Sequence, residues 1–478
     1  MSLVTRNLTP KQKALTINLD PNIYGTFAEI GAGQETVRHF FRAGGASHTI
    51  AKAMSAYDKD FSDAIYGKEF KNRYVTQNRL RKMLRYEAGL VEERIPREVN
   101  PHRKFFSYAN TVTTINFNKT VKGHGWVGIR FQNEAGEEYN EIVLHVKFKE
   151  NDATLQQETL GKLGVNLIYG AFYYDDNPRR LIESLYDDIS LDNVEIDMID
   201  FSGPHFAYVD NRLMSLQLVK SGMTDAVIFT AEGTNMLPAD LLYKKNVFAV
   251  RGSFRPVTLV NIDMFVNGLE NFKQDCGCAE EDIKVLFEIT ISNLRADGDI
   301  DERDFLDRVD VLGQLGYNVI ISNYSEYYRL TDYFAGFTNR KIGIAMGVNN
   351  LLDVFDEAYY DRLSGGILEA FGKFFRKDVR VYLYPYKDQA THEVWNAENL
   401  KVSDNLKELY KYFKHNNRIV DIKNYNPAYS EIYSRDILKK IANCEVGWES
   451  QLPEGVAELI KDRRMFGYKD EVTLDEIK

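Results

Sequence analysis

Short apolar runs alternate with amphipathic stretches along the middle of the chain. Each run precedes a polar or glycine-bearing turn and then a stretch of helical period, which is the pattern of βα units. The runs are too continuously apolar for strands that expose one face, so parallel strands covered on both faces are predicted. The eight runs are Val165–Tyr173, Val194–Phe201, Asp225–Thr230, Val247–Arg251, Lys284–Ile291, Tyr317–Ser322, Lys341–Met346 and Val379–Tyr384. Eight such strands favour a (β/α)8-like barrel, with an open parallel sheet as the alternative.

The amino-terminal part of the chain has a different pattern. Two helices are predicted, Gln34–Arg42 and Thr76–Arg94, followed by a change to period two. That change predicts three antiparallel strands, Phe105–Ile115, Trp126–Phe131 and Glu141–Phe148. The expected organisation is an α+β module with a small antiparallel sheet (residues 1–155), an α/β barrel (156–390) and a carboxy-terminal extension (391–478).

Composition narrows the class of protein. The 478 residues, 44% hydrophobic and 27% charged, are typical of a globular chain of more than one domain. A net charge of -10 argues against nucleic acid as a partner, and no apolar run reaches the roughly 18 residues of a membrane span. Three cysteines and an amino terminus without an apolar signal core favour a reducing compartment. We therefore expect a cytoplasmic protein with neither a membrane nor a nucleic-acid partner.

Barrels and open parallel sheets both bind ligands at the carboxyl ends of their strands. Arg251, Ser253 and Arg255 follow the fourth run at a helix start, where amides and guanidinium groups attract phosphate or carboxylate. Gly347 and Asn349 follow the seventh run, where many barrels bind phosphate. Surface ion pairs and helix capping are the structural alternatives for the arginines and for Asn349. A small anionic ligand is the predicted partner.

Other polar side chains follow the fifth and sixth runs. Asn293, Asn323 and Tyr324 are placed to orient a ligand at the same edge. Tyrosines also cluster at positions 324–328, 359–360 and 382–386. Such clusters suit a subunit interface or a stacking surface for a ring, with core packing as the alternative. The interface interpretation predicts a homo-oligomer.

Three titratable residues are candidates for acid and base catalysis. Asp200 and His205 follow the second run, where Asp210 adds a further carboxylate beside the imidazole. Glu288 lies inside the apolar fifth run, where a charge is costly unless it is paired or lines a cavity. Simple solvation of His205 and pairing of Glu288 are the alternatives.

Several tempting motifs are incomplete. Gly31 and Gly33 begin like a dinucleotide fingerprint, but Thr36 stands where the third glycine belongs, and the preceding strand is expected to be short at best. Cys276 and Cys278 supply at most half of a structural zinc site, so no metal is expected, and no cofactor is identified. The basic stretch at Arg79, Arg81, Lys82 and Arg85 is predicted to be a solvated helix face.

The chain resembles a family of uncharacterised bacterial proteins. The resemblance covers most of the chain and is carried by FAEIGAGQETVRHFFRAGGASHTIAKA (27–53), GKLGVNLIYGAF (161–172), FSGPHFAYVDNRLMSLQL (201–218) and RGSFRPVT (251–258). Members carry the label nicotinate-nucleotide adenylyltransferase or TonB-dependent receptor. The first label implies an H-x-G-H pair that this sequence lacks, and the second implies a signal peptide and many alternating strands.

The leading hypothesis is an enzyme that acts on a phosphorylated or nucleotide-like small molecule at the strand ends. Its rival is a non-catalytic protein that assembles through its tyrosine-rich surfaces. Nicotinate-nucleotide adenylyltransferase activity, as the family label implies, is a third hypothesis that the missing histidine pair disfavours. A fold alone does not decide among them.

Overall fold

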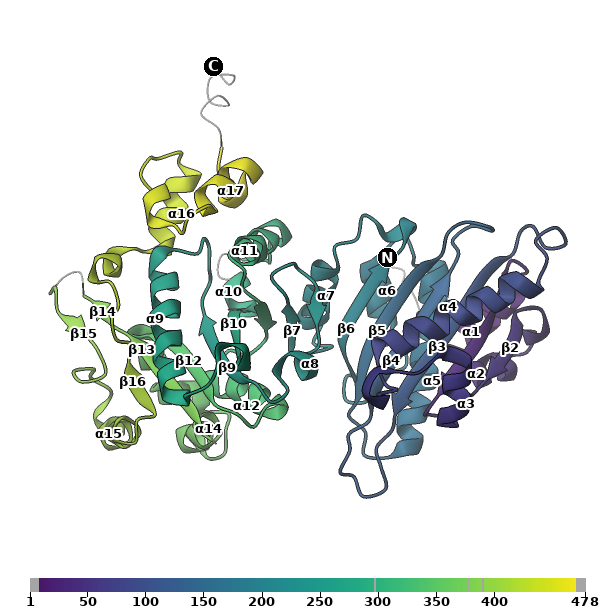
Figure 1. Cartoon of the computed structure of the whole chain (residues 1–478), viewed down its shortest axis with the longest axis horizontal. Helices are drawn as coiled ribbons and strands as arrows, with labels where there is room; N and C mark the ends of the chain where they lie inside the picture. Colours follow the sequence, from purple (N-terminus) through teal and green to yellow (C-terminus); the bar gives the residue numbers. More distant parts are fainter. Residues whose placement is uncertain (1–7, 296–297, 377, 389–390, 470–478) are drawn as a thin grey trace, which may run out of the picture. The chain divides into compact units, whose positions relative to one another are not determined.

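The computed structural model describes residues 8–295, 298–376, 378–388 and 391–469 (Figure 1). The chain divides into two compact units between Thr224 and Asp225. We expected the first boundary at 155/156. Two segments assigned to the barrel, Ala153–Tyr173 and Val194–Ser202, instead contribute buried residues to the core of the first unit.

The described residues of the first unit form a six-stranded sheet in the order β2-β1-β3-β4-β5-β6. Its strands are β1 (Ile23–Ile30), β2 (Ile50–Met54), β3 (Lys104–Thr113), β4 (His124–Phe131), β5 (Asn140–Phe148) and β6 (Val194–Ser202). The predicted meander of β3, β4 and β5 is confirmed, and β6 continues it antiparallel. Both β2 and β3 pair parallel to β1. The strand before Gly31 is therefore not short, because β1 spans eight residues.

Helices cover both faces of this sheet. They are α1 (Pro10–Leu19), α2 (Glu35–Ala43), α3 (Lys59–Tyr66), α4 (Gln77–Arg94), α5 (Ala153–Tyr173), α6 (Pro178–Ser184) and α7 (Asn211–Lys220), with 3-10 turns at Ala46–His48, Phe70–Asn72 and Pro204–Phe206. Figure 1 shows α4 across one face and α5 behind the other. The predicted helices at 34–42 and 76–94 correspond to α2 and α4.

The run Val165–Tyr173, predicted as a strand, is the second half of helix α5. Most of this half is buried, so its residues show no polar face from which a helical period could be read. Glycines bring neighbours close: a methyl group on Gly164 would lie 2.5 Å from the hydroxyl of Tyr108, and one on Gly170 would lie 2.9 Å from Leu181. A helix that is buried among α2, α6 and the sheet thus has the same continuous apolar sequence as a buried strand.

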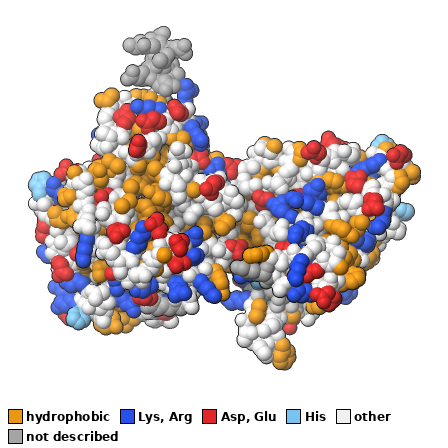
Figure 2. All heavy atoms as spheres, viewed as in Figure 1, with side chains coloured by type: hydrophobic (Ala, Val, Ile, Leu, Met, Phe, Trp, Pro, Cys, Tyr) orange, Lys and Arg blue, Asp and Glu red, His pale blue; other side chains and the backbone are white. Residues whose placement is uncertain are grey.

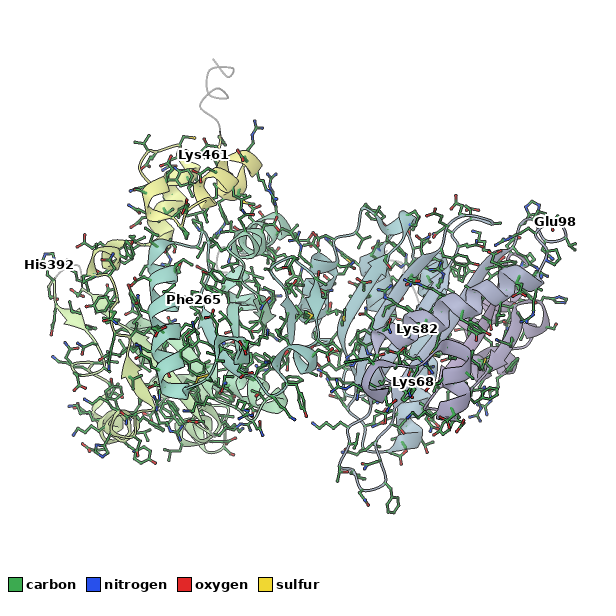
Figure 3. The ribbon with its side chains drawn as sticks, in the orientation of Figure 1. Lys68, Lys82, Glu98, Phe265, His392 and Lys461 are labelled. Carbon is green, nitrogen blue, oxygen red and sulfur yellow. A yellow bond between two sulfur atoms is a disulfide. The ribbon has the colours of Figure 1, made fainter. Side chains whose placement is uncertain are left out.

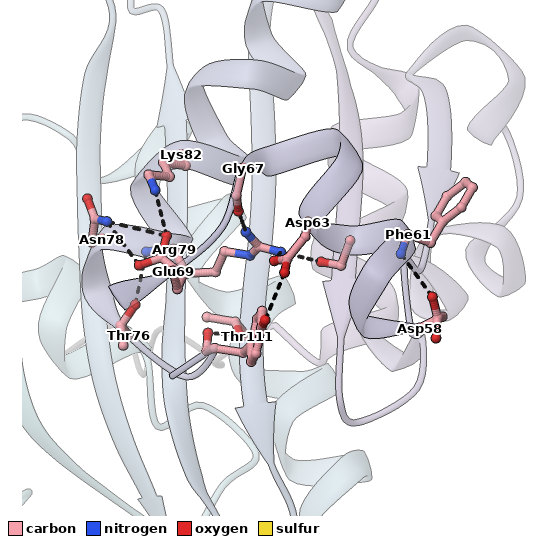
Figure 4. Close-up of polar contacts among 12 residues, drawn as sticks. Asp58, Phe61, Asp63, Gly67, Glu69, Thr76, Asn78, Arg79, Lys82 and Thr111 are labelled. Carbon is pink, nitrogen blue, oxygen red and sulfur yellow. Dashed lines mark hydrogen bonds and ion pairs between the residues drawn. The ribbon is translucent and has the colours of Figure 1, made fainter. Parts of the chain in front are cut away.

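The basic stretch of α4 is only partly a solvated face. Arg79 is almost fully buried, and its guanidinium donates to Ser62 Oγ at 2.5 Å and to the carbonyl of Gly67 (Figure 4). Nearby, Lys82 pairs with Glu69 at 2.8 Å. The prediction of a solvated face was wrong for Arg79. Its guanidinium is buried because it donates hydrogen bonds to the end of α3 and to the carbonyl of Gly67 that follows it.

The described residues of the second unit form an eight-stranded sheet in the order β16-β13-β12-β9-β10-β11-β7-β8. The strands are β7 (Ala226–Phe229), β8 (Asn235–Met236), β9 (Asn246–Arg251), β10 (Ile283–Thr290), β11 (Val319–Ser322), β12 (Ile342–Gly347), β13 (Val379–Tyr384) and β16 (Ile419–Asp421). A separate hairpin pairs β14 (Tyr386–Lys387) with β15 (Val394–Trp395). From β16 to β11 the strands are parallel, whereas β7 pairs antiparallel to β11 and β8 pairs antiparallel to β7.

The predicted closed barrel is not found among the described residues, because β16 and β8 are the two edges of an open sheet. Of the eight runs, those at β9 to β13 supply parallel strands, and β16 joins them. The run at β6 belongs to the first unit, and the run at β7 is antiparallel. In chain order the parallel strands lie 3-2-1-4-5-6, so the winding reverses between β9 and β12.

Helices pack on both faces of this sheet as well. They are α8 (Pro238–Leu242), α9 (Leu259–Cys276), α10 (Ile291–Leu294), α11 (Glu302–Gln314), α12 (Tyr327–Phe337), α13 (Val348–Val354), α14 (Gly366–Phe374), α15 (Lys407–His415), α16 (Ser434–Ala442) and α17 (Val456–Arg463). Short 3-10 turns lie at Glu280–Asp282, Glu357–Tyr360, Asp404–Leu406, Pro427–Glu431, Glu449–Gln451 and Met465–Gly467. On one face lies Phe265 of α9 (Figure 3). The centre of its ring is 5.2 Å from the centre of the Phe287 ring on β10. On the other, α12 and α14 join one core cluster.

The clustered tyrosines are mostly buried. Tyr324, Tyr327, Tyr360, Tyr382 and Tyr384 are all buried. Four of their hydroxyls make hydrogen bonds inside the protein, as in the 2.8 Å bond that Tyr360 donates to the carbonyl of Val354. Core packing, the alternative to a tyrosine-rich surface, is therefore what the structure shows for these five residues.

Candidate functional site at the carboxyl edge of the second sheet

A cavity of about 720 Å³ lies where β9, β10, β11 and β12 end, beside the reversal of winding. Its volume is within the range of small-molecule sites, and its position is the one where open α/β sheets bind ligands. It is lined by Arg251, Gly252, Ser253, Arg255, Thr290, Ser292, Asn293, Arg308, Ser325, Glu326, Tyr327, Asn350, Asp353, Val354, Tyr359, Tyr360, Ser434, Arg435, Leu438 and Lys439. All of these residues belong to the second unit.

The floor of the cavity contains a buried ion pair between Arg251 at the end of β9 and Glu288 on β10. Arg251 Nε donates to Glu288 Oε2 at 2.7 Å, and Nη2 donates to Oε1 at 2.9 Å. Ser322 of β11 donates to the same carboxylate at 2.6 Å. Burial opposes the charge of Arg251, yet Glu288 raises the pKa of the guanidinium above its ordinary value. The costly charge of Glu288 is thus compensated within the sheet.

Arg251 also touches the cavity wall. Its guanidinium lies 4.1 Å from the centre of the Tyr327 ring and donates through Nη1 to the carbonyl of Ser325 at 2.8 Å. Asn350 Nδ2 donates to the Tyr327 hydroxyl at 3.0 Å. Burial raises the pKa of Tyr327 to about 12, so the phenol keeps its proton near neutral pH. The network ties the loops after β9, β11 and β12 together.

A second basic group is held by one carboxylate of α11. Arg255 Nε donates to Asp304 Oδ1 at 2.5 Å, and Arg308 pairs with Asp304 Oδ2. Arg308 also donates to the carbonyls of Ser253 at 3.1 Å and Asn293 at 3.3 Å. The ion-pair alternative for Arg251 and Arg255 is therefore realised, while both residues still line the cavity.

Helix α16 supplies the basic residues that the sequence interpretation missed. Arg435 and Lys439, one turn apart, line the cavity together with Ser434 and Leu438. Both cations are exposed, and neither makes an ion pair with any residue that the structure describes. Lys440 on the same helix is not among the lining residues. No sequence motif marks α16, because only the path of the chain after β16 brings it to this edge.

Only some of the other residues predicted from the sequence line the cavity. Ser253 and Asn293 line the cavity with Arg251 and Arg255, while Asn350 lines it in place of its neighbour Asn349. Asn323, Tyr324, Gly347 and Asn349 are not among its lining residues in the described chain. Gly347 does end β12 beside β9 and begins α13 as its cap residue.

The three catalytic candidates do not form one group within a unit. Asp200 and His205 belong to the first unit, whereas Glu288 belongs to the second. Asp200 pairs with Arg81 at 2.6 Å, and His205 Nε2 lies 3.2 Å from Asp175. Burial raises the pKa of Asp200 despite that arginine. Asp200 and His205 thus lie against different residues, and His205 Nε2 makes no hydrogen bond with any described residue although Asp175 is near it.

The glycine turn of the first unit follows a full strand and leads into α2, as in a dinucleotide site. A buried carboxylate already occupies the amino end of that helix: Glu29 accepts from the amides of Thr36 at 3.2 Å and Val37 at 3.0 Å. Asn110 donates to it as well, at 3.2 Å. Burial raises the pKa of Glu29 to about 7. An internal carboxyl group thus takes the place that a phosphate would need.

Other chemical features are sparse. Cys276 and Cys278 are joined by a disulfide at the end of α9. Among the described residues no group of three or more His, Cys, Asp and Glu side chains could hold a metal ion. Within the same residues no helix has the length and apolar character that crossing a bilayer requires. On the face drawn in Figure 2, acidic and basic side chains of the second unit are intermixed.

No family model and no curated protein matches this chain. Among solved structures it is similar to a CinA-superfamily protein from Enterobacter cloacae, at 13% identity and TM-score 0.26, over 36% of this chain and 98% of that one. It is also similar to the competence/damage inducible protein CihA from Agrobacterium tumefaciens, at 16% identity and TM-score 0.25, over 35% and 97%. A putative nicotinate-nucleotide adenylyltransferase from Vibrio parahaemolyticus is similar at 14% identity and TM-score 0.25, over 47% of this chain and 97% of that one. These values assign neither a family nor an activity.

Proposed function

We propose that this protein is an enzyme acting on a phosphorylated or nucleotide-like small molecule that binds in the cavity at the carboxyl edge of the second sheet. The observation that carries the proposal is the pair Arg435 and Lys439, two lining cations without a carboxylate partner among the described residues. Unlike Arg255, they pair with no anionic side chain among the described residues, so an anionic ligand is the partner that their charge favours.

The position of the cavity supports the same conclusion. It lies at the reversal of winding in an open parallel sheet, and it combines aromatic walls with a few convergent polar groups. Arg251 forms the floor, and Glu288 holds its guanidinium in one orientation. In this proposal Glu288 is a positioning residue, because its oxygens are already occupied by Arg251 and Ser322.

Ligand-induced stabilisation tests the proposal. The melting temperature of the full chain is measured with inorganic phosphate, tripolyphosphate and adenosine monophosphate at constant ionic strength. Binding to the folded state raises the melting temperature with ligand concentration. The double variant Arg435→Ala/Lys439→Ala is expected to lose this response, and Lys440→Ala on the same helix is the matched control. If none of the three compounds shifts the wild-type protein, the proposal is wrong.

Assembly is a separate proposal. We propose a cytoplasmic homo-oligomer, although the buried tyrosines are not its interface. Exposed apolar side chains on the first unit, Leu19, Phe41 and Phe61 among them, are available for contact with a second copy. Light scattering at micromolar concentration that gives the mass of one chain contradicts it.

A further inference from the structure

The basic cavity also carries two carboxylates. Glu326 is the cap residue before α12, which follows β11, and Asp353 lies in the last turn of α13, which follows β12. Both line the cavity together with Tyr359, and Asp353 is the first cause of the raised pKa of that tyrosine. A carboxylate repels a bare phosphate, so these two side chains are not explained by anion binding alone.

Within the described residues, one carboxylate oxygen of Glu326 has no hydrogen-bond donor. It stands at the capping position but makes no side-chain capping bond to α12. Its Oε2 atom is buried and has no hydrogen-bond partner among the described residues, and Arg329 Nη1 lies 4.0 Å from it. An unpaired buried acceptor is unfavourable, and a donor on a ligand that reaches Glu326 can pair with it.

Asp353 offers a second acceptor on the same wall. It makes no ion pair with any described residue, and burial together with Asp356 raises its pKa above the ordinary value. Arg251, Arg255 and Arg308 are already paired with Glu288 or Asp304, so the cations left for a ligand are Arg435 and Lys439. A phosphate bound by these two cations leaves the two carboxylates as acceptors for the rest of the ligand, and hydroxyl groups can donate hydrogen bonds to them.

We propose that Glu326 and Asp353 accept hydrogen bonds from the hydroxyl groups of a sugar or polyol phosphate whose phosphate is bound by Arg435 and Lys439. The inference rests on the proposed function and narrows its substrate class. The basic helix α16 binds the phosphate, and the acidic side chains after β11 and β12 select for hydroxyls. Tyr359, about half exposed, lies at the same wall, where its ring can stack on an apolar sugar face.

Binding of two probes to the full chain separates these roles. Ribose 5-phosphate and inorganic phosphate are titrated by calorimetry into the wild type, Glu326→Gln, Asp353→Asn and the control Asp361→Asn. Asp361 is exposed, outside the cavity and without a described ion pair. Glu326→Gln is expected to lower the affinity for ribose 5-phosphate about tenfold, because a hydrogen bond to a charged acceptor is lost. The affinity for inorganic phosphate should stay equal or increase.

Each other outcome has a definite meaning. Equal weakening of both probes by Glu326→Gln, or no weakening of either, overturns the inference while leaving the proposed function intact. Tighter binding of phosphoethanolamine than of ribose 5-phosphate to the wild type also overturns it, because the acids then recognise an ammonium group. If neither phosphate nor ribose 5-phosphate binds the wild type, the proposed function fails and this inference fails with it.

Discussion

Glu288 and Arg251 face each other in register on adjacent parallel strands and are joined by two hydrogen bonds of 2.7 and 2.9 Å. The pair is almost fully buried, and Ser322 of the next strand supplies a third bond to the carboxylate. Because each charge is desolvated, each depends on the other. The relationship fixes Arg251 at the floor of the cavity and links its orientation to the stability of the sheet.

Glu288→Gln is expected to lower the free energy of unfolding of the second unit by about 3–5 kcal/mol, since it leaves the Arg251 guanidinium buried without a counter-charge. Urea denaturation followed by circular dichroism measures the change. Asp282→Asn, which breaks an exposed pair with Lys245, is the matched control and should cost less than about 1 kcal/mol. Similar effects of the two variants would contradict the buried-pair interpretation.

The first unit should lose stability as the pH rises through the titration of Glu29. Its folded-state pKa of about 7 exceeds the ordinary 4.5, so the native state holds a proton that the unfolded state releases. The protonated Glu29 adds on the order of 3 kcal/mol to the free energy of unfolding. This stabilisation is fully present below about pH 4.5 and is lost above about pH 7. Urea denaturation between pH 4.5 and 8.5 measures the slope. Glu29→Gln should flatten it, and an unchanged slope would exclude Glu29 as its source.

Two helical glycines should respond to alanine with opposite signs. Gly164 of α5 lies against Thr36 and the Tyr108 hydroxyl, so a methyl group there overpacks the helix contact and should destabilise by about 1–3 kcal/mol. Gly89 of α4 is exposed, with nothing within 4 Å of the added methyl. Gly89→Ala should therefore stabilise by about 0.5–1 kcal/mol through helix propensity. Thermal unfolding measures the stability change of each variant. Changes of the same sign in both variants would refute the packing argument.

Phosphate affinity should fall steeply with ionic strength, because Arg435 and Lys439 are exposed and their attraction is screened by salt. Calorimetric titration of tripolyphosphate between 0.05 and 0.5 M salt, roughly a threefold change in Debye length, measures the slope. Arg435→Ala/Lys439→Ala should leave little slope, and Lys440→Ala should retain most of it. A double variant as salt-sensitive as the wild type would place the anion site elsewhere.

Local sequence pattern predicted much of the secondary structure and part of the site. The strands at β9 to β13, the meander of β3 to β5 and the helices α2 and α4 follow from periods of two and 3.6 and from glycine positions. Arg251, Ser253, Arg255 and Asn293 were found because residues after parallel strands share one edge of a sheet. These inferences need only neighbours along the chain.

Other features depended on contacts between distant segments. Helix α5 is buried nearly all round, which removes the polar face that distinguishes a helix from a strand, and only its packing on α2 and the sheet decides. An open sheet and a barrel share the same βα pattern, and strand order alone separates them.

The sequence by itself therefore determined which residues follow parallel strands, since hydrophobic period and turn chemistry are local properties. The tertiary structure decided which of them share a cavity: it assigned Asp200 and His205 to the first unit, paired Glu288 with Arg251, and brought Arg435 and Lys439 to the edge on α16. The physical reason is that charge pairing and burial depend on distances in space, and residues almost 200 positions apart can lie in contact with one ligand.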